Sequence, residues 1–270
     1  MRPSPKVVVV VGGGSAATSE LAGAVADVPE AAMVVAADSG LATAMEHGLR
    51  VHHVVGDLDS VDPGLVTRAA AGGALVHRHP ADKDATDSEL ALNLAIELTV
   101  GRAAEPEADP APERPTGRDE ADDGDGDGAP GLLVLGGGGG RLDHLMADLS
   151  SLLSPRLAGL EVSARFGPAV VHVVRPGRGR LVGGAVGEYV SLLALHGPVG
   201  GVTTTGLRWA LADADLVPGA TRAISNEITS TEAAVSTTEG ALLVVRPGLI
   251  ADPVDPRPAA DVPALDPPLS

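Results

Sequence analysis

The sequence predicts an α/β fold, in which an N-terminal doubly wound, mainly parallel sheet with helices on both faces is followed by a smaller all-β domain of sandwich or barrel-like form. Two observations predict it. Short apolar runs alternate with helical segments up to about residue 155, and from about residue 160 the chain turns to β-branched runs punctuated by Gly, Pro and Asp. We expect an α/β domain over 1–158 and an all-β domain over 159–249.

Five short apolar runs supply the expected strands of the parallel sheet, because runs rich in Val, Leu and Ala are typical of strands buried on both faces. They lie at 7–11, 33–37, 51–55, 74–77 and 132–135. Among the helical segments, 88–98 carries Leu90, Leu94 and Leu98 at a spacing of four residues, which predicts a helix with one apolar face.

Two segments are expected to be disordered. Residues 101–130 hold ten acidic and three basic residues together with five prolines, and show no apolar periodicity. We interpret this insert as a solvated spacer within the α/β domain, and 250–270 as an extended proline-rich tail.

Composition argues against several function classes. The net charge is −17, which disfavours nucleic acid or an anionic membrane as the main partner. Cysteine is absent, which excludes disulfides and thiolate metal sites. The five valines at 7–11 form too short a run for a signal peptide or a membrane span, so we expect a soluble cytoplasmic protein with no membrane partner.

The stretch VVGDLDS, residues 54–60, ends an apolar run and then places Asp57 and Asp59 one residue apart. Side chains i and i+2 share a face while the backbone stays extended, so both carboxylates are expected to point the same way. Two such charges about 4 Å apart repel by about 1 kcal/mol in water and about 4 kcal/mol at a partly buried site, which favours a divalent cation between them. The alternative is a solvated turn in which Asp59 or Ser60 caps a helix that begins near Asp62.

A second cluster, Lys83, Asp84, Thr86 and Asp87, precedes the helix expected at 88–98. Thr86 and Glu89 fit a capping box, so helix initiation accounts for part of this motif. The free N–H groups of a helix N-terminus and the lysine charge suit phosphate oxygens, which predicts a phosphate-binding corner.

A third cluster, Arg141, Asp143 and His144, follows the expected strand at 132–135 and a run of five glycines. Glycines let backbone N–H groups approach an anion, and arginine can bind phosphate through two parallel hydrogen bonds. The alternative is a flexible turn in which Asp143 caps the next helix.

All three clusters follow strands of the same expected sheet and so lie at its carboxyl edge, where such folds bind ligands. We therefore expect a magnesium polyphosphate site there. Its side chains are Asp57, Asp59, Asp84, Asp87 and Asp143, with Lys83 and Arg141.

Six motifs together resemble the thiamine pyrophosphokinase family. They are AADSG (36–40), VVGDLDSV (54–61), KDATDSELAL (83–92), GGRLDH (139–144), GVTTTGLRWAL (201–211) and ISNE (224–227). The resemblance implies transfer of pyrophosphate from ATP to the hydroxyethyl oxygen of thiamine, giving thiamine diphosphate and AMP. It also implies a homodimer whose active clefts lie between the α/β domain of one subunit and the β domain of the other.

The resemblance assigns roles by position. Asp57, Asp59, Asp84 and Asp87 would bind Mg²⁺ and, with Asp143, act in catalysis; Asp38, Lys83, Thr86, Gly139, Arg141 and His144 would bind ATP; Thr205, Trp209, Ser225 and Asn226 would bind thiamine. For Trp209 the alternative is a buried core residue, and a cationic thiazolium would favour an aromatic face.

Three other functions stay open. The serine in AADSG and the less closely matched β half leave room for a diphosphokinase acting on another hydroxymethyl heterocycle, such as a pterin. The pattern DLDSV also fits haloacid-dehalogenase-like phosphatases, in which Asp57 would be the nucleophile and Asp59 the acid and base. A non-catalytic sensor of nucleotide or thiamine is the third.

Overall fold

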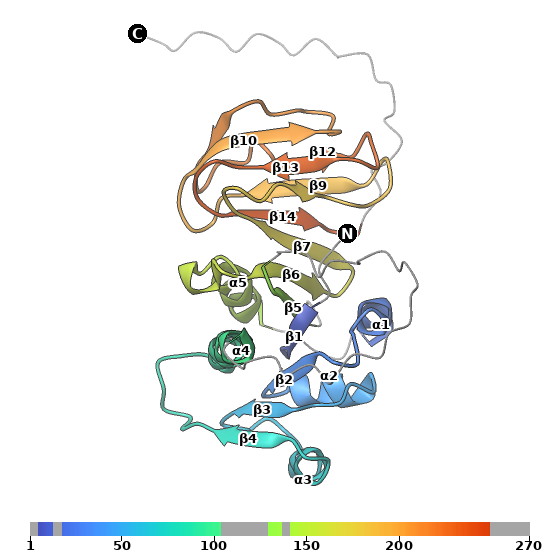
Figure 1. The fold of residues 1–270 in the computed structure, drawn as a ribbon, viewed down its shortest axis with the longest axis vertical. Helices are drawn as coiled ribbons and strands as arrows, with labels where there is room; N and C mark the ends of the chain where they lie inside the picture. Colours follow the sequence, from blue (N-terminus) through green and yellow to red (C-terminus); the bar gives the residue numbers. More distant parts are fainter. Residues whose placement is uncertain (1–4, 13–17, 104–128, 137–140, 249–270) are drawn as a thin grey trace, which may run out of the picture.

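The computed structural model describes residues 5–12, 18–103, 129–136 and 141–248 (Figure 1). None of the helices in these ranges is long and apolar enough to cross a membrane. The elements are β1 (Pro5–Val10), α1 (Thr18–Ala26), β2 (Met33–Ala37), α2 (Gly40–Glu46), β3 (His53–Gly56), α3 (Pro63–Ala71), β4 (Leu75–Arg78), α4 (Asp87–Ala103), β5 (Gly131–Gly136), α5 (Leu142–Ser151), the short 3₁₀ helix η2 (Pro155–Leu157), β6 (Glu161–Phe166), β7 (Ala169–Val174), β8 (Arg180–Leu181), β9 (Tyr189–Leu193), β10 (Val199–Thr205), β11 (Ala214–Leu216), β12 (Asn226–Glu227), β13 (Ala234–Ser236) and β14 (Leu242–Arg246).

One ten-stranded sheet runs along the long axis of the molecule, in the order β12-β9-β14-β7-β6-β5-β1-β2-β3-β4 (Figure 1). Strands β6 to β4 in that order pair in parallel, whereas β7, β14, β9 and β12 pair antiparallel. The predicted fold class is therefore confirmed. Because β6 pairs in parallel with β5, the sheet continues without a break past residue 158 into the second half of the chain.

Strands β1, β2, β3 and β5 are largely buried on both faces, as their apolar residues predict. The same expectation is wrong for β4, which lies at the edge of the sheet and whose four residues are exposed or half-buried. In β1, Val7 and Val9 belong to a core with Ala91 and Ala95 of α4, whereas Val8 and Val10 belong to a second core on the other face, which includes α1 and α2 residues. The period of two along a strand explains this division. Each such valine, once buried, contributes on the order of 1.5–3 kcal/mol, so the strand positions are strongly fixed.

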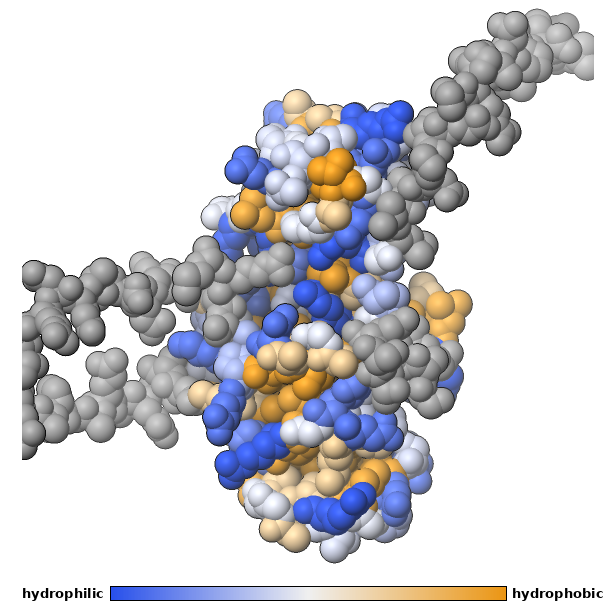
Figure 2. All heavy atoms as spheres, turned by 90° about the vertical axis from the view of Figure 1, so that its right-hand side faces the viewer, coloured by the Kyte–Doolittle hydropathy of each residue, from blue (hydrophilic) through white to orange (hydrophobic). Residues whose placement is uncertain are grey.

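The antiparallel half forms a sandwich. A second sheet, β11-β10-β13-β8, packs on the far strands of the large sheet, and the core between them includes Val190, Leu192, Val202, Val235 and Leu242. On the face shown in Figure 2, hydrophobic residues appear as separate areas on both halves, with hydrophilic residues around them.

One expected boundary moves. Helix α4 continues to Ala103 and so includes the first three residues of the segment expected to be disordered from 101. Residues 104–128 of that insert, and the tail after 248, lie outside the described residues.

Candidate active site

Strands β2 and β3 end side by side, and an aspartate follows each. The N–H of Asp38, after β2, donates to the Val55 carbonyl of β3 at 2.8 Å, and Asp57 directly follows β3. Asp38 has a φ of 44°, and a Cβ on Gly40 would lie 2.2 Å from the Val10 carbonyl oxygen. Close backbone packing against β1 therefore fixes this turn and leaves the Asp38 side chain beside β3.

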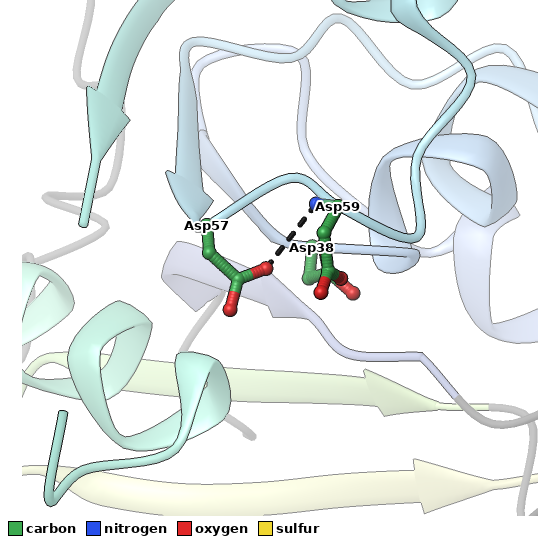
Figure 3. A group of neighbouring side chains, drawn as sticks. All are labelled: Asp38, Asp57 and Asp59. Carbon is green, nitrogen blue, oxygen red and sulfur yellow. Dashed lines mark hydrogen bonds between the residues drawn. The ribbon is translucent and has the colours of Figure 1, made fainter. Parts of the chain in front are cut away.

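Asp57 and Asp59 are brought together by a turn and not by extended backbone. Leu58 between them has a φ of 63°, and the Asp59 N–H donates to Asp57 Oδ1 at 3.2 Å. One oxygen from each of Asp38, Asp57 and Asp59 lies within 4.8 Å of the other two (Figure 3). We expected extended backbone to point both carboxylates the same way, and this reason is wrong. The left-handed conformation of Leu58 turns the chain and brings the two carboxylates together.

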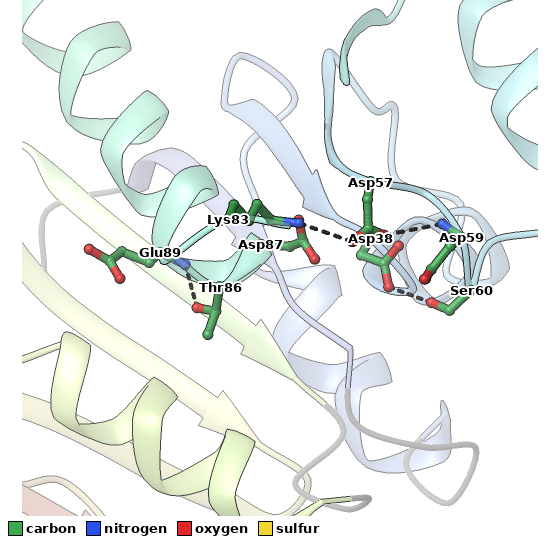
Figure 4. A network of polar contacts seen from close by, with 8 residues as sticks. All are labelled: Asp38, Asp57, Asp59, Ser60, Lys83, Thr86, Asp87 and Glu89. Atoms are coloured by element: carbon green, nitrogen blue, oxygen red, sulfur yellow. Dashed lines mark hydrogen bonds and ion pairs between the residues drawn. The ribbon is translucent and has the colours of Figure 1, made fainter. Parts of the chain in front are cut away.

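The helix-cap alternative for this loop is also wrong. Asp62 caps α3, because its Oδ1 accepts from the Gly64 N–H at 2.8 Å. Ser60 Oγ instead donates to Asp38 Oδ2, which ties the loop after β3 to the turn after β2 (Figure 4).

Lys83 links the first two acidic clusters. Its Nζ lies 3.0 Å from Asp57 Oδ2 and 3.2 Å from Asp87 Oδ1 (Figure 4). A Cβ on Gly56 would meet Asp87 Oδ1 at 3.1 Å and the Asp38 Cβ at 3.3 Å, so only a glycine fits easily between these two acids. Residues distant in sequence thus share one edge of the sheet.

The pKa values of Asp57 and Asp59 are shifted in opposite directions. The hydrogen bond from Lys83 lowers the pKa of Asp57, and the negative charge of Asp57 raises the pKa of Asp59. Burial opposes the charge of Lys83, but its hydrogen bonds with Asp57 and Asp87 outweigh this and raise the pKa of the ammonium. Within this pair, a further cation would therefore stabilise the charged form of Asp59 against the repulsion from Asp57.

The three grouped carboxylates fit a hard divalent cation. Asp38 Oδ1 is buried and accepts no hydrogen bond from any residue in the described ranges. All the candidate ligand atoms are carboxylate oxygens, which Mg²⁺ prefers. Sequence reasoning placed Asp38 with the nucleotide; the missed signal was that its strand neighbours β3 in a parallel sheet.

The remaining expected residues lie at helix starts. Thr86 Oγ1 accepts from the Glu89 N–H at 3.2 Å, as one half of a capping box, and Asp84 is exposed in the preceding loop. Asp84 and Asp87 are not among the carboxylates grouped around Asp38.

The third cluster makes an exposed ion pair. Arg141 donates to Asp143 through Nε at 3.1 Å and Nη2 at 2.6 Å, and this bond lowers the pKa of Asp143 to about 2. Asp143 lies inside the first turn of α5 and does not cap it. His144 is exposed, and Gly139 lies outside the described residues.

In the β half, the loop after β10 runs beside β12. Trp209 and Asn226 exchange hydrogen bonds, from Trp209 N–H to Asn226 Oδ1 at 3.0 Å and from Asn226 Nδ2 to the Trp209 carbonyl at 2.8 Å. Asn226 is 2% exposed, whereas Trp209 is 57% exposed. The core alternative for Trp209 is therefore wrong: the buried residue is Asn226, which holds the backbone while the indole faces solvent.

Two other expected thiamine residues are exposed near this segment. Ser225 has a φ of 54° and its N–H donates to Ser191 Oγ at 3.0 Å. Thr205, at the end of β10, lines a hollow of about 290 Å³ with Thr203 and Ser236. Trp209, Ser225 and Asn226 do not line that hollow.

Two family models match consecutive parts of the chain. The thiamin pyrophosphokinase catalytic domain model matches residues 27–164, and the thiamin pyrophosphokinase vitamin B1 binding domain model matches 174–242. A thiamine pyrophosphokinase of Bacillus subtilis is 22% identical over 212 residues, which cover 78% of this chain and 86% of the relative.

Solved structures show the same fold. The Bacillus subtilis thiamine pyrophosphokinase structure has a TM-score of 0.66 at 22% identity, covering 92% of this chain and 100% of that one. The thiamin pyrophosphokinase structure from Geobacillus thermodenitrificans has a TM-score of 0.64 at 26% identity, covering 92% and 99%. Since the catalytic domain model alone spans half of the sequence, this chain belongs to the thiamin pyrophosphokinase family.

Proposed function

We propose that this chain transfers a pyrophosphoryl group from ATP to thiamine. The thiamine hydroxyl oxygen bonds to the β-phosphorus, the bond from that phosphorus to the bridging α-phosphate oxygen breaks, AMP leaves and the hydroxyl proton is released. Family membership supports this activity. The main structural support is that Asp38, Asp57, Asp59 and Lys83 lie together at one edge of the sheet.

Asp38, Asp57 and Asp59 would hold Mg²⁺, which supplies positive charge to the phosphate oxygens. Lys83 keeps Asp57 ionised and fixes its orientation through a 3.0 Å contact. Asp84, Thr86, Arg141 and the residues beside them stand at the starts of α4 and α5, where free N–H groups favour anions. Their roles toward ATP, and those of Asp87, Asp143, His144 and Gly139, are part of the proposal.

We further propose that the active site forms between two copies of the chain. Asn226 lies in β12 and Asp38 directly follows β2, and these strands are seven places apart in the sheet order. At about 4.8 Å per strand, the distance between Asn226 and Asp38 within one chain is roughly 34 Å. Thiamine bound beside Asn226 would then lie too far from a triphosphate bound at Asp38 for the two to react. Figure 1 shows β12 and β2 in different halves of the molecule along its long axis, with other strands of the sheet between them. A second copy would bring its Trp209 segment to the acids of the first.

The decisive assay supplies the protein with ATP, Mg²⁺ and a panel of acceptors. We expect AMP and thiamine diphosphate in equal amounts with thiamine, and no such release with a hydroxymethyl pterin. If AMP were released with the pterin but not with thiamine, the acceptor would be a hydroxymethyl pterin and not thiamine. Release of inorganic phosphate from a phosphate monoester would favour the phosphatase. Full turnover by an Asp57→Asn variant would leave only a role outside catalysis for the acids.

Mixing two inactive variants tests the shared site. Asp57→Asn and Trp209→Ala, unfolded and refolded together, should regain about one quarter of wild-type activity, because about half of the dimers are mixed and each has one intact site. Either variant refolded alone is the control. Failure to regain activity, with mixed dimers shown to be present, would place both halves of the site in one chain.

A further inference from the structure

The indole of Trp209 has one face already covered. The Arg208 guanidinium carbon lies 5.3 Å from the centroid of the Trp209 ring. A cation at this distance from an aromatic face is attracted by the ring quadrupole. Since Trp209 is 57% exposed, the ring keeps surface that a ligand can reach.

The guanidinium is itself held in place. Arg208 Nη1 lies 2.8 Å from Glu227 Oε2, and the Arg208 N–H donates to the Glu227 carbonyl at 2.9 Å. The Glu227 side chain is 21% exposed and that of Arg208 is 42% exposed. Asn226 fixes the backbone on both sides, because its Oδ1 accepts from the N–H groups of Trp209 and Glu227 at 3.0 and 2.9 Å.

We propose that Arg208 and Glu227 are positioning residues that hold the indole in one orientation, so that its uncovered face is presented to the thiamine ring. This inference rests on the proposed function. A tryptophan on an exposed loop would otherwise populate several rotamers, and only part of that population would be ready to stack on a ligand. The guanidinium reduces this loss by lying over the opposite face, 5.3 Å from the ring centroid, and Glu227 keeps the guanidinium there.

The chain makes the test direct, because Trp209 is its only tryptophan. Fluorescence anisotropy of the free full-length protein reports the mobility of this indole, and a thiamine titration with Mg²⁺ and α,β-methylene ATP reports binding. The variants are Arg208→Met, Arg208→Lys and Glu227→Gln. Arg156→Met is the matched control, since Arg156 is an exposed arginine on η2.

We expect Arg208→Met to lower the anisotropy and to raise both Kd and KM for thiamine about two- to fivefold, while kcat and the KM for ATP stay unchanged. Arg208→Lys keeps the positive charge but lacks the planar guanidinium, so it should retain part of the affinity that Arg208→Met loses. Glu227→Gln should change the same quantities less.

Unchanged anisotropy and unchanged thiamine affinity in Arg208→Met would overturn the inference. So would a loss confined to kcat, because this would place the guanidinium at the reacting atoms. If wild-type Trp209 fluorescence and turnover do not respond to thiamine, the proposed function fails instead. The anisotropy of the free variants then still decides whether Arg208 holds the indole.

Discussion

The two halves of the proposed site are built in opposite ways. The acid cluster, Asp38, Asp57, Asp59, Lys83 and Asp87, gathers side chains from three separate segments at the end of a parallel sheet. The Trp209 segment joins two short stretches through backbone and amide hydrogen bonds beside β12. In the first half the sheet core fixes the backbone and the charged groups gather at the ends of its strands. In the second half a buried amide fixes the backbone and a ring faces solvent.

Because of this difference, we expect substitutions in the acid cluster to change activity with little change in stability, and a substitution of Asn226 to change both. In the acid cluster, the strand ends are held by buried valines, so a carboxylate can change without loss of the fold. In the Trp209 segment, the amide that holds the loop is itself a core polar group, so the same side chain carries both fold and binding geometry.

The largest expected effect comes from Asp57→Asn. In the proposed function this change removes a charge that would hold Mg²⁺ against the phosphates, so kcat/KM should fall about 100- to 1,000-fold, or about 3–4 kcal/mol, while the melting temperature stays near that of the wild type. Steady-state kinetics and thermal denaturation measure both. Asp62→Asn in the same loop is the control, because asparagine caps α3 about as well as aspartate. A large loss of stability in Asp57→Asn would break the comparison.

The second effect falls on stability. Asn226→Ala leaves the Trp209 N–H and carbonyl and the Glu227 N–H without their partner, so the free energy of unfolding should drop by about 2 kcal/mol. Denaturant unfolding followed by Trp209 fluorescence measures it. Asn93→Ala changes the other asparagine of the chain, within α4, where alanine favours the helix. If both variants unfold alike, the amide clamp has no special role.

The smallest effect is a change in titration without added divalent ion. Lys83→Met should raise the pKa of Asp57, because the hydrogen bond that lowers it is lost. The lowered pKa means that Asp57 stabilises the fold above its unfolded pKa and loses this as pH falls through its folded pKa. Asp59, with a raised pKa, acts in the opposite sense, so the two contributions partly offset. NMR titration of the carboxylates in both proteins measures the shift, and an unmoved Asp57 would remove Lys83 from its assigned role.

The sequence by itself determined the five strands at 7–11, 33–37, 51–55, 74–77 and 132–135, the helix near 88–98, and the strand ends at which the acids stand. Alternating apolar runs predict two-sided burial because the side chains of a strand alternate between its faces, and Val7 to Val10 divide between the two cores in this way. The glycine and aspartates after β3 mark the carboxyl edge for the same local reason.

Only the tertiary structure decided which of these residues meet. Asp38 joins Asp57 and Asp59 because β2 pairs with β3, and Asp62 rather than Asp59 or Ser60 caps α3 because a left-handed Leu58 turns the loop. Arg208 covers one face of Trp209 because β12 carries Glu227 beside it. Strand neighbours, turn conformations and rotamers depend on contacts between distant segments, and local sequence patterns do not predict those contacts.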